Sequence, residues 1–315
     1  MTATTTTSQI STVHLAGYQG AASILTAALR ELAQALEDSD WGLPVAFESD
    51  VTARGEKATE LFASLESGER QIGYMASSYL SGRVPELRVL DLPFTVSDRG
   101  AALRALDGTA GELLREAVAR ESGFQVLAFW DNGFRHISNA VRPIRSPADC
   151  AGLVIRTLDN ADYRAMLDSL GFTAVTTDVK ELVHAVRSGA VQAQENPLTN
   201  LISFGLWRHH PHVSLSGHFF GVLLLVCPRD WYEALEPPQR AALGRAVDRA
   251  TATQRERAAG QDAAALDELL VRGVKVLGPE QIDLAAMHAA TRAVSARQRS
   301  TLAPELLAAY LPALH

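Results

Sequence analysis

An arginine at the end of an apolar run is the residue whose type and position most suggest binding chemistry. In the segment GLVIRTLDN, residues 152–160, Arg156 directly follows Leu153, Val154 and Ile155. Such a run is typical of a buried strand, and its C-terminal end is where binding crevices open in α/β sheets. A guanidinium can donate two parallel hydrogen bonds to a carboxylate, which a lysine cannot do. The segment therefore indicates either a carboxylate-binding site or a structural ion pair with Asp159 or Asp149.

The sequence contains no other strong motif for catalysis or cofactor binding. The sequence contains no GxGxxG, GxxxxGK[ST], HExxH or GxSxG motif, which lowers the expectation of dinucleotide, phosphate, zinc or serine-hydrolase chemistry. The acidic pairs in DELL and LEDSD are spaced as on solvated helix faces and ends and suggest no acid and base pair. We therefore predict no catalytic residue and no cofactor.

A histidine cluster and two cysteines were the remaining candidates for metal or thiol chemistry. The segment WRHHPH contains His209, His210 and His212 without HxxxH spacing and without a cysteine or carboxylate, so we expect a solvated loop and no metal site. Cys150 and Cys227 form no CxxC pair, and neither has a neighbouring base in the sequence. We expect no nucleophilic thiol, while one disulfide between the two cysteines stays open.

Length, charge and hydropathy limit the classes of partner. A chain of 315 residues favours about two domains. Its net charge of -7 without a Lys/Arg block excludes a nucleic-acid footprint and favours small-molecule partners. The longest apolar run, FFGVLLLVC at 219–227, is about half of a membrane span and predicts a core strand. The N-terminus lacks the features of a secretory signal, so the chain is either cytosolic or a leader has been removed.

The order of elements predicts an open α/β architecture. Strand patterns at 13–16 and 43–49 alternate with helix patterns at 21–39 and 54–67, and a second alternating set begins near Phe124. This is the pattern of a mostly parallel sheet with helices on its faces. The segment 238–271 is rich in helix formers, interrupted by Gly244 and Gly260, and predicts one long helix or two abutting ones. A single helix of that length would span roughly 50 Å, enough to cross two lobes.

One local pattern occurs twice and predicts a cleft. An amphipathic helix, a Ser-Gly pair and a short strand follow one another at Ser67-Gly68 and again at Ser188-Gly189. Glycine readily takes the left-handed conformation that ends a helix, so each pair predicts a helix-to-strand corner. The strands that follow end at YMASS and QENP. Because ligands gather at the carboxyl ends of such strands, both ends are expected to face one cleft between two similarly built lobes.

Together these segments resemble a known family. The block FWDNGFRHISNAVRPIRSPADCAGLVIRT, followed by ELVHAVRSGAVQAQENP, with VPELRVLDLPF upstream and GHFFGVLLLV downstream, is similar to the substrate-binding proteins of tripartite ATP-independent periplasmic (TRAP) transporters. The resemblance implies a periplasmic-binding-protein-like α/β fold of two lobes with a cleft between them and a long helix spanning both. It implies a first lobe at 10–132 plus 222–260, a second at 133–221 plus 261–315, and a disordered tail at 1–9.

The same resemblance implies a function without chemistry. The chain would be a periplasmic solute-binding protein, not an enzyme, that captures a small organic acid and delivers it to a TRAP membrane permease for ion-gradient-driven uptake. It would not itself span the membrane, and its leader would have been removed. Two alternatives on the same fold are an enzyme and a ligand sensor, each using Arg156 to hold a carboxylate.

The resemblance also assigns binding residues. Arg156 would make the bidentate contact with the substrate carboxylate, Arg135 of NGFRH would be a second arginine, and Asn196 would be the asparagine of QENP. Val179 stands where many members place an aromatic residue, so the pocket wall differs and a bulkier or more apolar acid is conceivable. The full predicted substrate-binding set is Arg156, Arg135, Asn196, Trp130, Asn132, Tyr18, Gln19, Glu60, Tyr79 and Val179.

Overall fold

The structure, a computed structural model, describes residues 12–311, so the tail predicted at 1–9 lies outside the described residues. The strands are β1 (Val13–Ala16), β2 (Val45–Glu48), β3 (Ile72–Ala76), β4 (Phe124–Asn139), β5 (Val154–Thr157), β6 (Thr173–Thr176), β7 (Ala193–Pro197), β8 (His212–Pro228) and β9 (Lys275–Leu277). The α-helices are α1 (Ile24–Glu37), α2 (Glu60–Glu66), α3 (Ser77–Leu80), α4 (Arg99–Asp107), α5 (Thr109–Ser122), α6 (Ala161–Ser169), α7 (Val179–Arg187), α8 (Leu198–Ser203), α9 (Arg229–Ala234), α10 (Pro237–Val271), α11 (Leu284–Ser300) and α12 (Pro304–Tyr310). The 3-10 helices are η1 (Val51–Arg54), η2 (Pro85–Asp91), η3 (Pro147–Cys150), η4 (Leu206–Arg208) and η5 (Pro279–Gln281).

All nine described strands belong to one mixed sheet, in the order β2-β1-β3-β8-β4-β7-β5-β6 with β9 beside β8. The triplets β2-β1-β3 and β7-β5-β6 are parallel, as the alternating pattern predicted. The two central strands are antiparallel to each other, to β3 and to β7, which differs from a mostly parallel sheet, and only the short β9 pairs with β8 in parallel. Helices α9 and α10 connect β8 to the parallel β9, whereas β8 and β3, β4 and β7, and β4 and β8 are not joined by a single crossover helix, so the constraint that makes neighbours parallel is absent there. We call the unit around β1–β3 the first lobe and the unit around β5–β7 the second lobe.

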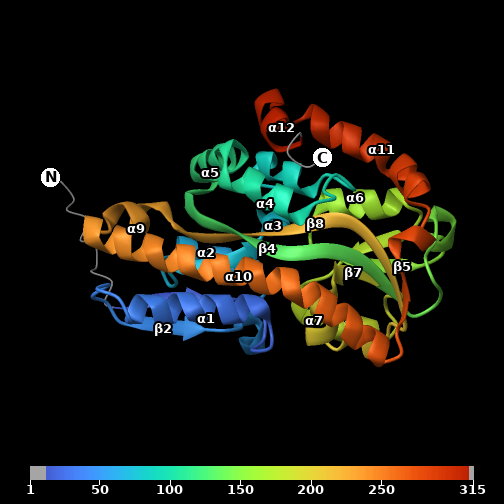
Figure 1. Cartoon of the computed structure of the whole chain (residues 1–315), viewed down its shortest axis with the longest axis horizontal. Helices are drawn as coiled ribbons and strands as arrows, with labels where there is room; N and C mark the ends of the chain where they lie inside the picture. Colours follow the sequence, from blue (N-terminus) through green and yellow to red (C-terminus); the bar gives the residue numbers. More distant parts are fainter. Residues whose placement is uncertain (1–11, 312–315) are drawn as a thin grey trace.

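Strands β4 and β8 connect the two lobes. They pair from Phe124 opposite Pro228 to Asn139 opposite His212, so each strand runs through both lobes (Figure 1). The pairing shifts register between Asp131 and Phe134, where Gly133 has a φ of 76°. A bulge of this kind bends a strand and increases its twist. The change in direction therefore falls where the two strands pass from one lobe to the other.

The repeated helix-to-strand pattern is confirmed in both lobes. Helix α2 leads through Gly68, with a φ of 77°, into β3, and α7 leads through Gly189, with a φ of 74°, into β7. Each strand is followed at once by a short helix, α3 in the first lobe and α8 in the second. The two carboxyl ends, at Ala76 and Pro197, therefore belong to equivalent positions of similarly built lobes.

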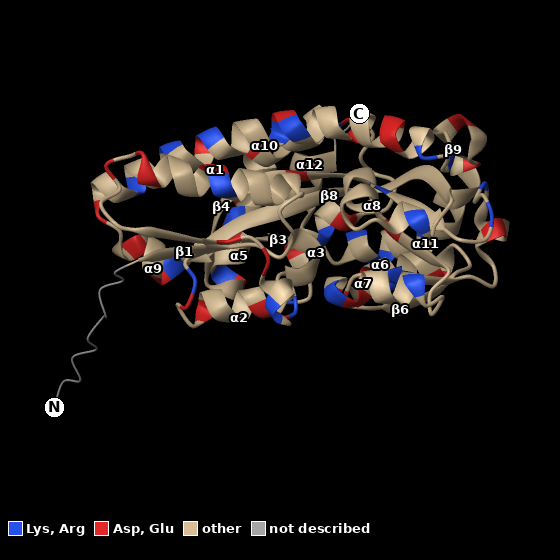
Figure 2. Cartoon of the chain, turned by 90° about the horizontal axis from the view of Figure 1, so that it is seen from below, with Lys and Arg blue, Asp and Glu red and all other residues tan. Residues whose placement is uncertain are grey.

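Helix α10 is one continuous helix of 35 residues that lies across both lobes (Figure 1). It packs against α1 and β4, and acidic and basic residues both occur along its exposed side (Figure 2). Arg99 ties it to the crossing strand, because this guanidinium bonds Asp131 of β4 at 2.8 Å and also Asp262 of α10. Gly244 and Gly260 lie within the helix and do not divide it.

The buried apolar side chains of the described residues form one large cluster in the first lobe, a smaller one in the second, and two minor clusters around α8 and α7. The predicted core strand FFGVLLLVC is the interior of β8, and most of it belongs to the first cluster. Helix α11 packs on the second cluster through Met287 and Val294, whereas α12 packs on the first through Leu306 and Tyr310. The residue boundaries of the two lobes stay a prediction, and this packing favours placing 304–310 with the first lobe.

Helix α10 predicts a stabilising substitution. Gly260 is exposed, and a Cβ at this position would meet no atom within 4 Å. Gly260→Ala is expected to raise the free energy of unfolding by up to about 1 kcal/mol, because glycine is a poor helix former. Gly111→Ala is the contrasting variant, because its Cβ would collide with the backbone oxygen of Leu106. Urea denaturation of both variants checks this, and a less stable Gly260→Ala protein would contradict it.

Candidate functional site: a buried guanidinium in the interlobe cleft

Arg156 is a buried cation without a carboxylate partner. It is the third residue of β5, and its side chain is only 2% exposed. Its Nε donates to the backbone oxygen of Thr177 at 2.9 Å, and Nη2 donates to the same oxygen. No acidic side chain among residues 12–311 pairs with it, and Asp149 instead accepts bonds from the backbone of Arg145 and Ser146. The alternative of a structural ion pair with Asp149 or Asp159 is therefore wrong.

The groups around Arg156 come from both lobes. Burial lowers the pKa of its guanidinium, and the nearby charges that act on it belong to Tyr79, Glu195, Arg135 and Asp178. Tyr79 lies on α3 at the end of β3, and its own pKa is raised by burial while Arg156 and Arg135 lower it. The prediction that the ends of β3 and β7 face one cleft is consistent with this placement of Tyr79 opposite the two arginines.

Arg135 lies near Arg156 but is already paired. Its Nη2 donates to Glu195 Oε1 at 2.9 Å and to the Glu195 backbone oxygen at 3.0 Å, and its Nε bonds Oε2. Burial alone would lower the pKa of Arg135, but the Glu195 carboxylate raises it above its ordinary value. His218 lies 3.5 Å from the same carboxylate, and Thr157 donates to it at 2.8 Å. The net charge of the Arg135–Glu195 pair is zero, so the uncompensated cation of the site is Arg156.

Asn196 is held in a chain of buried amide and hydroxyl groups. Its Nδ2 donates to Gln194 Oε1 at 2.5 Å, and its Oδ1 accepts from Asn200 at 3.1 Å. Gln194 in turn donates to Ser138, whose hydroxyl lies 3.0 Å from His210. One amide hydrogen of Asn196 has no partner among the described residues, so this side chain can still donate a hydrogen bond.

A cavity of about 330 Å³ lies between the lobes. The first lobe contributes a mostly polar wall and the second lobe a more apolar one that begins at α7. The lining residues are Tyr18, Gln19, Gly20, Ala22, Ser23, Asp50 and Thr52 on the first lobe and Val179, Lys180, Val183, Ser203 and Phe204 on the second. Lys180 also donates to the backbone oxygen of Gly55 at 2.7 Å, which joins α7 to the first lobe directly.

Three predicted residues, Tyr18, Gln19 and Val179, line this cavity. The ring of Tyr18 lies 6.3 Å from that of Tyr79, which connects the cavity wall to the residue facing Arg156. Gln19 accepts a hydrogen bond from Ser23 at 2.6 Å. Arg156 is not part of the cavity surface and lies deeper, at the end of β5.

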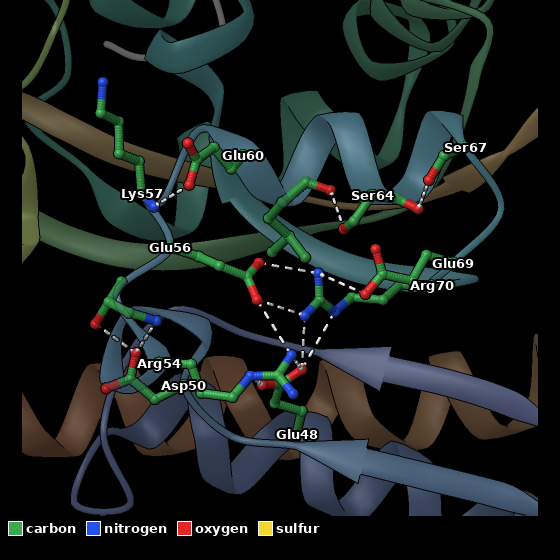
Figure 3. A network of polar contacts seen from close by, with 12 residues as sticks. Glu48, Asp50, Arg54, Glu56, Lys57, Glu60, Ser64, Ser67, Glu69 and Arg70 are labelled. Carbon is green, nitrogen blue, oxygen red and sulfur yellow. Dashed lines mark hydrogen bonds and ion pairs between the residues drawn. The ribbon is translucent and has the colours of Figure 1, made fainter.

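Three other predicted residues lie elsewhere. Trp130 is fully buried in the first-lobe cluster, where its Nε1 donates to Thr251 at 3.0 Å. Asn132 lines a second cavity, of about 270 Å³, beside Thr199 and Asn200. Glu60 is exposed at the start of α2, where its carboxylate caps the backbone of Lys57 at 2.6 Å (Figure 3). The structure does not bring these three side chains to Arg156.

Asp50, Thr52 and Lys180 are lining residues that sequence reasoning missed. The segment that carries Asp50 and Thr52 is fixed by a compact ion network centred on Arg70, which is 3% exposed (Figure 3). Arg70 bonds Glu48 at 2.9 Å and Glu56 at 3.0 Å. The alternating charges of 48–56 could have signalled a network, but its partner Arg70 is too distant in the sequence to be inferred.

The expectation of a solvated histidine loop was wrong at His210. His210 is fully buried, not solvated, and burial lowers its pKa to about 4. Among the described residues no group of three histidine, cysteine or acidic side chains could hold a metal ion. Cys150 and Cys227 are both buried and unpaired with each other, and burial raises the pKa of the Cys150 thiol to about 12. The described part of the chain also has no helix that is both long and apolar enough to cross a membrane.

Two α/β lobes joined by crossing strands and a long helix, with a buried cation at the cleft, define a two-lobed ligand-binding protein. The chain belongs to the family described as bacterial extracellular solute-binding protein, family 7, whose sequence profile matches residues 20–301. The resemblance to TRAP solute-binding proteins is thereby confirmed. Members of this family are transport proteins that bind solutes, and the chain is accordingly not an enzyme.

Several known proteins are similar to this chain. A solute-binding protein of Verminephrobacter eiseniae is 30% identical over 76% of this chain and 70% of its own length. The 2,3-diketo-L-gulonate-binding periplasmic protein YiaO of Escherichia coli is 27% identical over 70% of this chain and 67% of its own length. A TRAP periplasmic solute-binding protein from a Bordetella species, whose crystal density was assigned to pantoate, is 25% identical. It superposes with a TM-score of 0.87 over 95% of this chain and 98% of that one.

The Arg135–Glu195 pair predicts a strong effect on stability. Burial alone would raise the pKa of Glu195, but Arg135 and His218 lower it to about 2. Glu195→Gln would leave a buried guanidinium uncompensated and is expected to cost about 3–5 kcal/mol. Because the folded-state pKa is depressed, the contribution of Glu195 is present above about pH 4.5 and is lost as the pH falls toward 2. Urea denaturation at pH 7 and pH 3 checks this, and equal losses at both would contradict it.

Asp91 predicts the opposite pH dependence. Its carboxylate accepts a hydrogen bond from Tyr163 at 2.9 Å, and burial raises its pKa from 3.8 to about 7. Between these pH values the folded state binds more protons than the unfolded state, so stability falls as the pH rises. Asp91→Asn keeps an acceptor for Tyr163 but cannot titrate. As the pH rises from 5 to 8, its free energy of unfolding relative to that of wild type is therefore expected to increase by on the order of 2 kcal/mol. Denaturation curves at the two pH values measure this difference, and parallel pH profiles would rule it out.

Proposed function

We propose that this protein captures a small organic acid between its lobes, with Arg156 as the principal carboxylate-binding residue, and delivers it to a TRAP membrane permease from the periplasm. The single observation that carries the proposal is the state of Arg156: buried, cationic and bonded only to a backbone carbonyl. A buried charge without a counter-ion is costly. A substrate carboxylate would supply that counter-ion.

The hydrogen bonds of Arg156 suggest how the acid would dock. Thr177 occupies the edge formed by Nε and Nη2, and Nη1 has no partner among residues 12–311. A carboxylate can therefore accept two parallel bonds from the edge formed by Nη1 and Nη2. Each charge-assisted hydrogen bond contributes roughly 1.5 to 3 kcal/mol, so this contact could dominate affinity.

Arg135 has a different role in this proposal from the one the resemblance implied. Its Nε and Nη2 are bonded to Glu195, and only Nη1 is without a partner among the described residues. It can donate one further hydrogen bond, but its charge is already compensated. Arg135 would therefore orient the acid, together with the remaining amide hydrogen of Asn196, and Arg156 would supply the attraction.

The cavity wall favours a hydroxylated acid. Asp50, Thr52, Gln19, Ser23 and Ser203 provide hydroxyl, amide and carboxylate groups that can bond substrate hydroxyls. One oxygen of Asp50 is engaged by Thr52, and the other has no partner among the described residues. The diketogulonate in the name of YiaO and the pantoate assigned to the Bordetella structure are both hydroxy acids, which supports this class. The bulkier or more apolar acid suggested by Val179 receives less support.

Binding would be coupled to closure of the cleft. An acid held by Arg156 gains contacts from Tyr18, Gln19 and Tyr79 of the first lobe only when the lobes approach. A ligand shifts a conformational equilibrium by its differential affinity for the two states. The closed, loaded form would then be the form that the permease recognises.

Arg156→Lys tests the proposal. The substitution keeps the charge but removes the planar fork, so the dissociation constant for the cognate acid is expected to rise at least about tenfold. The acid is first identified by a thermal-shift screen of hydroxylated carboxylic acids, because a ligand at 100 times its dissociation constant stabilises by roughly 2.7 kcal/mol. Calorimetry then compares wild type with Arg156→Lys.

Arg142→Lys, on the surface, is the matched control and should leave the affinity unchanged; its guanidinium bonds only the backbone oxygens of Asp149 and Ala151. Unaltered binding by Arg156→Lys would refute the assignment of this residue. No thermal shift with any carboxylic acid would refute the proposed function itself.

A further inference from the structure

A groove between the second lobe and the segment that follows η2 combines a cavity with unpaired positive charge. We call it the α11 groove: it lies between α11 and the segment 93–95 and has a volume of about 400 Å³. Its lining residues are Pro93, Phe94, Thr95, His288, Thr291, Arg292, Ser295, Ala296 and Arg299. None of them is acidic, and three carry a hydroxyl group. The lining is thus suited to anionic ligands.

The charge of α11 is unusual for this protein. The whole chain has a net charge of -7, yet the 17 residues of α11 include Arg292, Arg297 and Arg299 and no aspartate or glutamate. The spacing of His288, Arg292, Ser295 and Arg299 is three or four residues, which places them on one face of the helix. The positive charges of Arg292 and Arg299 therefore lie on the face of α11 that lines the groove.

The two arginines of the groove have no partners within the described part of the chain. Arg292 and Arg299 are exposed and take part in no side-chain hydrogen bond or ion pair between residues 12 and 311. Some exposed arginines elsewhere pair with carboxylates, as Arg54 does with Glu48 and Arg120 with Glu86, and others, such as Arg245 and Arg249, do not pair within residues 12–311, so it is the position of Arg292 and Arg299 beside a cavity that sets them apart. Their guanidinium groups are free to bind carboxylates of another molecule.

The length of the groove indicates the kind of anion. From His288 to Arg299 the helix rises about 16 Å, which equals about five residues of an extended chain. A phosphate ion is much shorter than this stretch. Several carboxylates on one extended peptide could bond both guanidinium groups and the hydroxyls between them.

The opposite wall of the groove is held in place. Phe94 has a left-handed φ of 55°, its backbone N–H donates to the backbone oxygen of His218 at 2.8 Å, and its ring lies 4.7 Å from that of His288. The segment follows directly after Asp91, whose carboxylate bonds Tyr163 of the second lobe. The wall of the groove is therefore continuous with a contact between η2 and α6.

We propose that the α11 groove binds an acidic peptide segment of a partner protein. The carboxylates of the segment pair with Arg292 and Arg299, and its backbone lies along Thr291 and Ser295. Identifying the partner as the membrane permease rests on the proposed function, whereas binding of an acidic segment does not. Because the groove continues into the contact between η2 and α6, a bound segment would be sensitive to the arrangement of the lobes.

Microscale thermophoresis of the full chain with acetylated hexaglutamate tests this. The Arg292→Glu, Arg299→Glu double variant is expected to bind at least about tenfold more weakly than wild type, because attraction is replaced by repulsion at two positions. Arg297→Glu changes the charge of the same helix outside the groove and is expected to retain most of the binding. Wild-type binding should weaken as ionic strength rises.

Three results would overturn the proposal: no hexaglutamate binding by wild type, an equal loss in Arg297→Glu, or binding only to phosphatidylglycerol vesicles or to inorganic phosphate. The double variant should keep the wild-type thermal shift with the cognate acid, which shows that it is folded. Loss of peptide binding with an intact acid response separates this proposal from the proposed function. Failure of the acid response in wild type would instead refute the proposed function alone.

Discussion

The pairing of Arg135 with Glu195 is the interaction on which the character of the cleft depends. Two guanidinium groups are buried near each other, and like charges in a poorly solvated interior repel strongly. Glu195 compensates one of them, with Thr157 and His218 completing the bonds to its carboxylate. Of the two buried guanidinium groups, only that of Arg156 is then without a paired carboxylate among the described residues. A second uncompensated cation would raise the cost of folding, and a second carboxylate would remove the reason for an anion to bind.

The crossing strands explain how this arrangement is maintained. Arg135 lies on β4, Glu195 on β7 and Arg156 on β5, and these strands are neighbours in the sheet in the order β4-β7-β5. Arg135 is opposite Pro197 across one ladder, and Arg156 is opposite Gln194 across the next. The relative positions of the two arginines are thus fixed by backbone hydrogen bonds. Segments outside the strands supply the opposite wall of the cavity, where the ion network around Arg70 restrains the segment that carries Asp50.

Sequence reasoning reached the parts of the fold and site that depend on local patterns. The Ser-Gly corners, the core strand in β8, the long α10 and the position of Arg156 follow from periodicity, capping and turn chemistry. The antiparallel central strands could not be predicted, because the local sequence does not indicate which distant strands β4 and β8 will pair with. The partner of Arg135 was missed for the same reason: Glu195 is 60 residues away, and only the pairing of β4 with β7 brings them together. The burial of Trp130 in the first-lobe cluster could not be predicted either, because its position beside NGFRH does not indicate which face of β4 it occupies.

The contacts between the lobes indicate that a ligand needs to add only a small free energy to favour the closed form. Among the described residues, Lys180 bonds the backbone of Gly55, Asn160 bonds Ser78 and Ser81, Tyr163 bonds Asp91, and Arg88 pairs with Asp162 at 3.2 Å. A typical hydrogen bond contributes only about 0.5–1.5 kcal/mol net, so these few contacts can nearly balance the loss of freedom on closing without locking the lobes together. Under such a balance, two charge-assisted bonds to Arg156 suffice to change the population of closed molecules by orders of magnitude. The polar contacts between the lobes therefore leave the cleft able to open, and the unpaired charge of Arg156 allows a bound acid to favour the closed form.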